Sequence, residues 1–418
     1  GSRLRLISSR LFIGVPRLTL VPADGAWSTM APGFAVLLAS ACNNGAVTST
    51  GAGGFKVPDL KALEKLGTPE GKVSVLAWPG YVEDGSNDKT VDWVTPFEKD
   101  TGCQVNVKVF NTSDEAVKLM QTGQYDVVSA SGDASLRLIA SGDAAPVNTD
   151  LLKNYGSIES FLKDRDWNSV DGQMYGVPHG WGANLLAYNT KVVKPAPTSW
   201  SAVFDDASKY AGKVTAYNSP IYIADAALYL MKHQPDLGIE NPYALDEDQL
   251  AAAVDLLKNQ RKYVSEYWAD YLQEVQAFTT GNSVIGTAWQ INALVAQGEG
   301  APIKTVFPEE TSTGWSDTWM IQPDSPHSNC GYAWMDWITG PTAQAGVAEW
   351  FGEAPANTKA CSLTVNKDHC DEYHAADKAY SDKIWYWTTP ISSCLDGRTD
   401  VKCTDYGDWT TAWTEIKG

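Results

Sequence analysis

The stretch "GKVSVLAWPGYV" (residues 71–82) decides the fold, because it begins a regular alternation of strands and helices. Val73, Val75 and Ala77 occupy every second position, which predicts a strand that ends in a Trp-Pro-Gly-Tyr loop. Four segments follow in order: a helix in "VDWVTPFEKDTG" (91–102), a strand in "CQVNVKVF" (103–110), a capped helix in "TSDEAVKLMQTG" (112–123) and a buried strand in "YDVVSAS" (125–131). This alternation predicts an α/β fold with a largely parallel sheet.

A second α/β unit begins at "GVPHGWGANLLAYNT" (176–190), where the pattern restarts. Farther along, "WSDTWMIQP" (315–323) and the helical "CGYAWMDWITG" (330–340) indicate a return to the first lobe. A chain that crosses more than once between two lobes forms a hinge, with a crevice for a ligand between the lobes. The predicted parts are lobe 1 at 72–183 and 313–385, lobe 2 at 184–312, and a C-terminal segment at 386–418 that packs on lobe 2.

Residues 1–42 have the pattern of an export signal, because arginines precede the apolar run "FAVLLASAC" (34–42). The pattern favours a bacterial lipoprotein signal in which Cys42 carries the lipid; an ordinary secretory signal with a coincidental cysteine is the alternative. Residues 43–71 are predicted to form a flexible tether. No apolar run reaches the roughly 18–20 residues that span a bilayer, so the lipid anchor is the expected membrane contact. We therefore expect an exported protein, on the bacterial cell surface or in the periplasm.

The chain is strongly acidic, with a formal net charge of -18 over 418 residues. Such a charge argues against nucleic acid and anionic membranes as partners and favours cationic ligands, although a solvated acidic surface is the simpler explanation. The chain also contains 17 Trp and 18 Tyr. Tryptophans are seldom exposed without a purpose, and many of these are expected to pack in the core or between the lobes.

Six cysteines remain besides Cys42, and an even number in an exported chain predicts disulfides. They are Cys103, Cys330, Cys361, Cys370, Cys394 and Cys403. Six cysteines allow fifteen pairings. The short intervals 361–370 and 394–403 suit local loops, which would leave Cys103 with Cys330, but the spacing does not choose among the pairings. No CxxC or HExxH pattern occurs, so we expect neither a metal site nor a cofactor.

The order and spacing of seven segments carry a family resemblance: "VSVLAWPGYV", "YDVVSAS", "YGVPHGWGANLLAYN", "TSWSAVFDDASKYAGKV", "GTAWQ", "APIKTVFPEE" and "GWSDTWMI". From about Gly71 to the C-terminus, the chain resembles the extracellular solute-binding proteins of ABC importers, and most closely their spermidine/putrescine-binding branch. The resemblance implies a two-lobed periplasmic-binding-protein-like fold of type II, with a hinge and an interlobe cleft. It also implies a non-catalytic protein, expected to be a monomer, that captures a small cationic amine and delivers it to an ABC permease.

In the polyamine-binding branch, aromatic rings sandwich the methylene chain of the ligand and carboxylates meet its amino groups. Position by position, the resemblance implies ligand contacts at Trp78, Tyr81, Ser131, Trp289, Trp315 and Asp317. Asp317 is the expected partner of an ammonium or a secondary amine. Trp181, in "HGWGAN", either lines the cleft or packs the hinge.

The chain departs from this branch at four positions that are also expected to line the cleft. Ser219 and Tyr222 stand where the branch has two carboxylates for a terminal amine, Asp133 stands where an aromatic ring is usual, and Glu353 replaces a tyrosine. Acidic groups are therefore redistributed rather than merely lost. The resemblance implies an amine ligand, such as putrescine or spermidine, without choosing among amines.

The segment "GWSDTW" (314–319) places Asp317 between Trp315 and Trp319 on one face of a strand. A carboxylate among aromatic surfaces is costly to dehydrate, but a wet cleft tolerates it and a bound cation compensates it. Each aromatic face adds about 0.5–2 kcal/mol of attraction for an ammonium. The alternative is that Asp317 caps a helix or pairs with a nearby Lys or Arg. Trp319 is expected to lie in the core.

Two other functions compete with amine capture. A binding protein for a sugar or another neutral solute would need Asn, Gln and Arg around the rings, and it would tolerate Asp317→Asn. A secreted glycoside hydrolase would also suit an acidic, Trp-rich chain. However, the chain beyond residue 42 contains no GxSxG, P-loop or GxGxxG signature, so the prediction is that the protein is not an enzyme.

Overall fold

The structure is a computed structural model that describes residues 49–50 and 55–418. The predicted export signal at 1–42, including Cys42, and part of the tether lie outside the described residues. A short antiparallel pair, β1 (Ser49–Thr50) and β2 (Lys56–Val57), precedes the main fold. Within the described part of the chain, no helix has both the length and the apolar character needed to cross a membrane.

The larger sheet has seven strands in the order β15-β8-β14-β5-β3-β4, with β16 paired to β14. Their bounds are β3 (Lys72–Ala77), β4 (Gln104–Val109), β5 (Val127–Ala130), β8 (Val177–Ala183), β14 (Ser312–Ile321), β15 (Ala354–Pro355) and β16 (Ile384–Tyr386). The three strands predicted at the start of the fold are parallel to one another, whereas β14 runs antiparallel to β5 and β8. The sheet is therefore mixed rather than largely parallel, because β14 enters it from the other half of the molecule.

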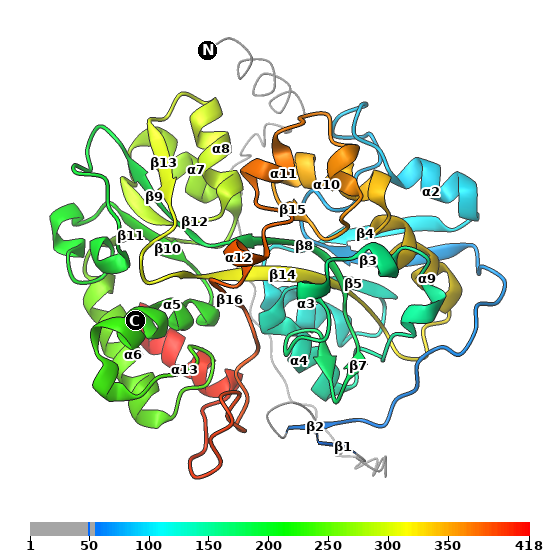
Figure 1. Cartoon of the computed structure of the whole chain (residues 1–418), viewed down its shortest axis with the longest axis horizontal. Helices are drawn as coiled ribbons and strands as arrows, with labels where there is room; N and C mark the ends of the chain where they lie inside the picture. The colour runs from blue at the N-terminus through cyan, green and yellow to red at the C-terminus, as the bar shows by residue number, and fades with distance from the viewer. Residues whose placement is uncertain (1–48, 51–54) are drawn as a thin grey trace, which may run out of the picture.

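The smaller sheet has five strands in the order β11-β10-β12-β9-β13. Their bounds are β9 (Leu185–Asn189), β10 (Val214–Tyr217), β11 (Val264–Trp268), β12 (Ile285–Ala288) and β13 (Ile303–Val306). The two sheets occupy separate halves of the molecule (Figure 1), and the chain passes between them after β8 and again before β14. We propose that these halves are the two lobes, with the boundaries predicted above.

Helices cover both sheets (Figure 1). Their bounds are α2 (Val94–Thr101), α3 (Ser113–Met120), α4 (Gly132–Ser141), α5 (Ile223–His233), α6 (Glu247–Arg261), α7 (Tyr271–Thr280), α8 (Gln290–Gly298), α9 (Ser328–Ile338), α10 (Pro341–Phe351), α11 (His369–Glu372), α12 (Lys378–Ser381) and α13 (Tyr406–Lys417). Local sequence explains several helix ends. Gly102, with φ of 74°, ends α2 in the left-handed region, and the Thr112 side chain accepts the Glu115 N–H at the start of α3. The two helices predicted between the first three strands are thus present.

Each half has its own apolar core. The larger sheet packs around residues such as Phe97, Val128 and Trp334, and Trp319 is fully buried there as expected. The smaller sheet forms a second core, to which α13 contributes Trp409 among other side chains. The end of the chain thus packs against the second half, where α13 contacts α6.

Three disulfides complete the fold, and they resolve the pairing that the spacing left open. Cys103, the residue before β4, is joined to Cys330 in α9, which links the two chain segments that build the larger half. The other two bridges close local loops, between Cys361 and Cys370 and between Cys394 and Cys403. All six predicted cysteines are therefore oxidised, in agreement with an exported protein.

Candidate functional site

A pocket of about 460 Å³, which includes its open mouth, lies between the two halves. The larger half contributes the loop after β3, the start of α4, strand β14 and the end of α10, and the smaller half contributes the end of β12 and the start of α7. The lining residues are Trp78, Pro79, Asn111, Ser131, Ala269, Asp270, Tyr271, Trp289, Trp315, Asp317, Phe351 and Trp387. Its place between the two halves is typical of a site for a small solute.

Aromatic rings from both halves form the walls. Trp78 meets Trp289 edge-on across the pocket, with ring centroids 6.4 Å apart. Behind Trp289, Tyr217 stacks on Trp387 at 5.5 Å with nearly parallel planes. Trp315 meets Phe351 edge-on at 5.9 Å. The pocket therefore offers π faces to a guest from both sides, and these faces attract cations.

Asp317 is the buried acid of this pocket, with 3% of its surface exposed. Its Oδ2 accepts the Tyr81 hydroxyl at 2.6 Å, and its Oδ1 accepts the Ser131 hydroxyl at 2.5 Å. Ser131 in turn accepts the indole N–H of Trp78 at 3.2 Å. Burial raises the pKa of Asp317 to about 6, even though the two hydrogen bonds lower it, and the nearby charge of Asp133 raises it further. Both of its partners in the described structure are hydroxyls, which excludes the helix-cap and ion-pair alternatives for this side chain.

The charged side chains of the pocket lining are all acidic. Among the described residues that line it, none is Lys or Arg, and two are carboxylic acids. The second acid is Asp270, from the smaller half, which caps α7 by accepting the Leu272 N–H at 2.8 Å. A guest in the pocket thus meets one acid from each half. Negative charge without a neighbouring cation favours a positively charged guest.

A second layer of polar groups lies behind the pocket. Tyr81, fully buried, also lies 2.9 Å from Oε2 of Glu353 through its hydroxyl oxygen. Burial raises the pKa of Glu353 well above its usual range, and the charge of Asp317 raises it further. His179 Nε2 lies 3.3 Å from Oε1 of Glu353, and burial lowers the His179 pKa to about 3. Tyr81 and Glu353 therefore support the pocket rather than line it.

Five of the predicted contacts line the pocket together: Trp78, Ser131, Trp289, Trp315 and Asp317. They come from segments far apart in the sequence, and their ligand-binding role stays a prediction. Sequence reasoning missed Asp270 and Tyr271. The spacing Asp270-x-x-Gln273 is a capping-box signal that could have placed a helix start here, but not its position at the mouth of a pocket.

Four other predicted contacts lie elsewhere. Asp133 is buried at the start of α4, where it accepts the Ser113 hydroxyl at 2.8 Å. Trp181 packs edge-on against Phe161 in a separate apolar cluster, which favours the packing alternative for this residue.

Ser219 and Tyr222 belong to the core of the smaller half. The Ser219 side chain caps the short helix at Pro220–Tyr222, and the Tyr222 ring meets Trp413 of α13 at 6.0 Å. Both side chains have structural partners, and neither lines the pocket. The C-terminal helix that covers Tyr222 supplies the physical reason.

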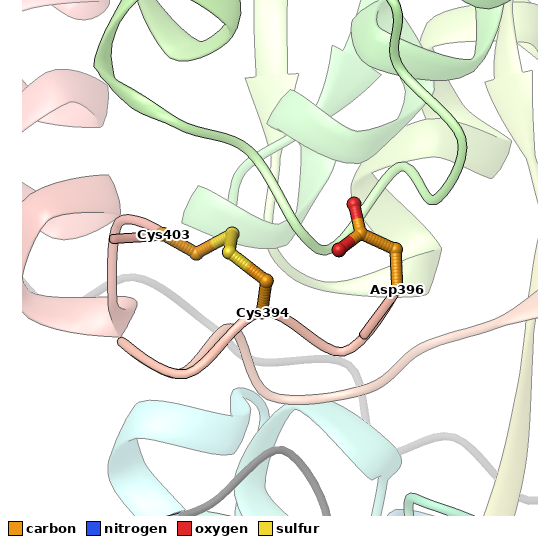
Figure 2. A group of neighbouring side chains, drawn as sticks. All are labelled: Cys394, Asp396 and Cys403. Carbon is orange, nitrogen blue, oxygen red and sulfur yellow. A yellow bond between two sulfur atoms is a disulfide. The ribbon is translucent and has the colours of Figure 1, made fainter. Parts of the chain in front are cut away.

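One group of side chains has the composition of a metal site but not its chemistry. Cys394, Asp396 and Cys403 lie close together (Figure 2). The two sulfurs are joined in a disulfide, so neither is a thiolate, and Asp396 pairs with Arg398 at 2.8 Å. This group stabilises the C-terminal loop.

Comparisons with known proteins agree with this geometry. The sequence profile of a family described as bacterial extracellular solute-binding protein matches residues 92–369. The chain is 26% identical over 300 residues to a putrescine/agmatine-binding protein of Pseudomonas aeruginosa, covering 66% of this chain and 79% of that protein. It is 22% identical over 290 residues to the spermidine/putrescine-binding periplasmic protein of Escherichia coli, covering 68% and 78%. The TpPotD lipoprotein of Treponema pallidum has a similar fold, with a TM-score of 0.66 at 16% identity, covering 83% of this chain and 99% of that one.

Proposed function

Because the chain belongs to the bacterial extracellular solute-binding protein family, we propose that it captures a small cationic amine of the polyamine class between its lobes. Delivery to an ABC permease follows from the same proposal. The two bacterial relatives named for polyamines support this assignment. Members of the family bind solutes and are not enzymes, which is what the sequence predicted.

The observation that carries the proposal is Asp317, a buried carboxylate in a pocket lined by four tryptophans. An ammonium at this place would gain a charge-assisted hydrogen bond from Asp317 and about 0.5–2 kcal/mol from each ring face. A neutral sugar would leave the buried charge uncompensated, which costs several kcal/mol. An anionic solute would be repelled by both acids. The pocket therefore favours a cation over the alternative solutes.

A diamine fits the pocket better than a monoamine, because the two acids come from different halves. One ammonium would meet Asp317 and the other would approach Asp270, with the methylene chain lying along the aromatic walls of the pocket. Such a ligand contacts both lobes only when they are closed. Its binding would therefore shift the population toward the closed state through these additional contacts.

The finer predictions belong to this proposal. We infer that the protein acts as a monomer, that Cys42 anchors it through a lipid, and that the hinge lies where the chain passes between the sheets. Mass spectrometry of the membrane-bound form tests the lipid, and sedimentation of the soluble domain tests the monomer. An unmodified Cys42 or a stable dimer would contradict the respective inference.

A thermal-shift screen tests the function. Putrescine, agmatine and spermidine should raise the melting temperature, because a ligand at 100 times its Kd stabilises the native state by about 2.7 kcal/mol. Glucose and maltose should not. The variant Asp317→Asn should lose most of the amine shift, whereas Asp255→Asn, at an exposed position of α6, should keep it. A shift with a sugar and none with any amine would overturn the proposal.

A further inference from the structure

Behind the pocket, the Tyr81 hydroxyl contacts two carboxyl groups, Asp317 and Glu353. Its single proton can stabilise only one of them as an anion. We propose that Glu353 is a positioning residue that remains a protonated carboxylic acid, directs the Tyr81 hydroxyl toward Asp317, and thereby keeps the negative charge at the pocket. The proposal rests on the proposed function in one respect, since it assigns that charge to the binding of an amine.

The argument begins with the hydroxyl of Tyr81, which has one proton and two carboxyl neighbours. Its oxygen lies 2.6 Å from Asp317 Oδ2 and 2.9 Å from Glu353 Oε2. One proton can be donated to only one of them, so the other contact needs a proton on a carboxyl group. Two ionised carboxylates around one phenol would leave one unpaired anion in a dry interior, which is costly. The two acids therefore share a single negative charge.

The neighbours of Asp317 place that charge on Asp317. Ser131 accepts the indole N–H of Trp78, which can only donate, so the Ser131 hydroxyl proton is free to point at Asp317. Asp317 therefore receives two hydroxyl donors, and hydrogen bonds to the charged form favour ionisation. It also lines the pocket, where a cation can approach.

The neighbours of Glu353 offer much less to an anion. Gln344 Oε1 accepts the backbone N–H groups of Ala356 and Asn357, which fixes the orientation of its amide. Its amide nitrogen then faces His179 Nδ1 at 3.1 Å, so Nδ1 is the unprotonated nitrogen of the imidazole.

The remaining proton of the neutral imidazole is thus on Nε2, 3.3 Å from Glu353 Oε1 and without good hydrogen-bond geometry. A neutral ring at this distance compensates little charge. Glu353 is 1% exposed, so water does not compensate it either. A protonated Glu353 instead donates Oε2–H to the Tyr81 oxygen, so the protons of Glu353 and Tyr81 both have acceptors. The raised pKa of Glu353 agrees with this assignment.

The backbone makes room for this carboxyl group. A Cβ at Gly180 would lie 2.3 Å from Glu353 Cδ, so only glycine permits the observed position. Strand β15, which follows Glu353 directly, pairs with β8 at Gly180 and holds the side chain over that glycine. The position is therefore determined by packing, and it does not depend on a charge on Glu353.

The test compares two substitutions of Glu353. Glu353→Gln is a neutral isostere of the protonated acid, since its amide can donate to Tyr81 and accept from His179. Glu353→Met has a similar size but cannot donate. If Glu353 is protonated, the Gln variant should bind putrescine within about threefold of the natural protein, and the Met variant should lose at least tenfold by calorimetry at pH 7.5. Equal losses in both variants, or natural affinity in both, would overturn the proposal.

A second measurement needs no ligand, so it separates this proposal from the proposed function. Infrared difference spectra between the natural protein and Glu353→Gln at pH 7.5 should contain the carbonyl band of a protonated carboxylic acid, present only in the natural protein. Absence of that band would overturn the protonation of Glu353, whatever the protein binds. Its presence in a protein that no amine stabilises would instead overturn the proposed function alone. Melting temperatures of both variants confirm that they are folded.

Discussion

Amine affinity should depend on pH through Asp317. The side chain must be ionised to pair with an ammonium, and burial raises its pKa to about 6 in the ligand-free protein. Alkylammonium groups lose their proton only near pH 10, so the ligand keeps its positive charge throughout the range of interest. As the pH falls below 6, protons therefore compete with the amine for the same oxygen atoms, and the affinity decreases.

The size of the effect follows from the fraction of Asp317 that is ionised. With a pKa of about 6, Asp317 is almost fully ionised at pH 7.5 and only about one-tenth ionised at pH 5. The apparent Kd should therefore rise by about tenfold between these pH values, or about 1.4 kcal/mol. Three acidic groups face Asp317, namely Tyr81, Glu353 and Asp133. The first two have pKa values raised well above the usual range, and burial raises the pKa of Asp133 to about 6, so Asp133 could add to the slope.

Calorimetric titration with putrescine at half-unit steps from pH 5 to 7.5 provides the measurement. The Asp317→Asn variant distinguishes the contributions of Asp317 and Asp133 to the pH dependence of the affinity. It removes the carboxylate from the pocket and leaves Asp133 in place. Its affinity should be at least tenfold weaker at pH 7.5 and should change with pH much less than that of the natural protein. A flat profile in the natural protein, or the same slope in the variant, would refute the assignment of the amine to Asp317.

Three further predictions concern other parts of the molecule. Trp289→Leu should weaken amine binding by about 1–2 kcal/mol, because a pocket ring is lost, whereas Trp181→Phe should lower the melting temperature and leave the affinity unchanged; titration of both variants compares them directly. Replacing Cys103 and Cys330 by Ala should lower the free energy of unfolding by about 5 kcal/mol at most, since the bridge closes a loop of 227 residues, and an unchanged urea midpoint would contradict this. Burial raises the pKa of Asp225 to about 7, above its value in the unfolded chain, so the native protein loses stability as the pH rises through 7. Asp225→Asn should reduce this loss of stability between pH 5.5 and 8. Melting curves of the variant and the natural protein with identical pH dependence would argue against it.

The early strands and helices were predictable because their signals are local. Alternating apolar positions at 72–77 and a glycine after α2 specify the elements wherever the rest of the chain lies. The mixed sheet was not predictable in the same way. Strand β14 lies antiparallel to β5 because it returns from the other half, and the direction of such a return is not contained in the strand's own residues.

The site was predictable where it depends on one segment and not where it depends on several. Asp317 and Trp315 share one face of β14, and that periodicity places both at the pocket. Tyr222 was expected there too, but its ring is covered by Trp413, which lies far away in sequence and close by in the fold. Asp270 lines the pocket only because the smaller half meets the larger one there. Contacts of this kind depend on packing between distant segments, for which a single sequence contains no periodic signal.

The buried acids of this chain explain why its overall charge is a poor guide to its ligand. Burial raises the pKa of several carboxyl groups, among them Asp133, Asp225, Glu274, Asp317 and Glu353. A buried acid that no cation can reach avoids its desolvation cost by keeping a proton. Of these five, Asp317 alone lines the pocket, so it alone can exchange a proton for an ammonium. A neutral guest would displace the water around Asp317 without supplying a positive charge, and an anion would add repulsion. If the proposed role of Asp317 is correct, selectivity for a cation follows from the position of one carboxyl group, and the many exposed acids contribute little because solvent and salt screen them.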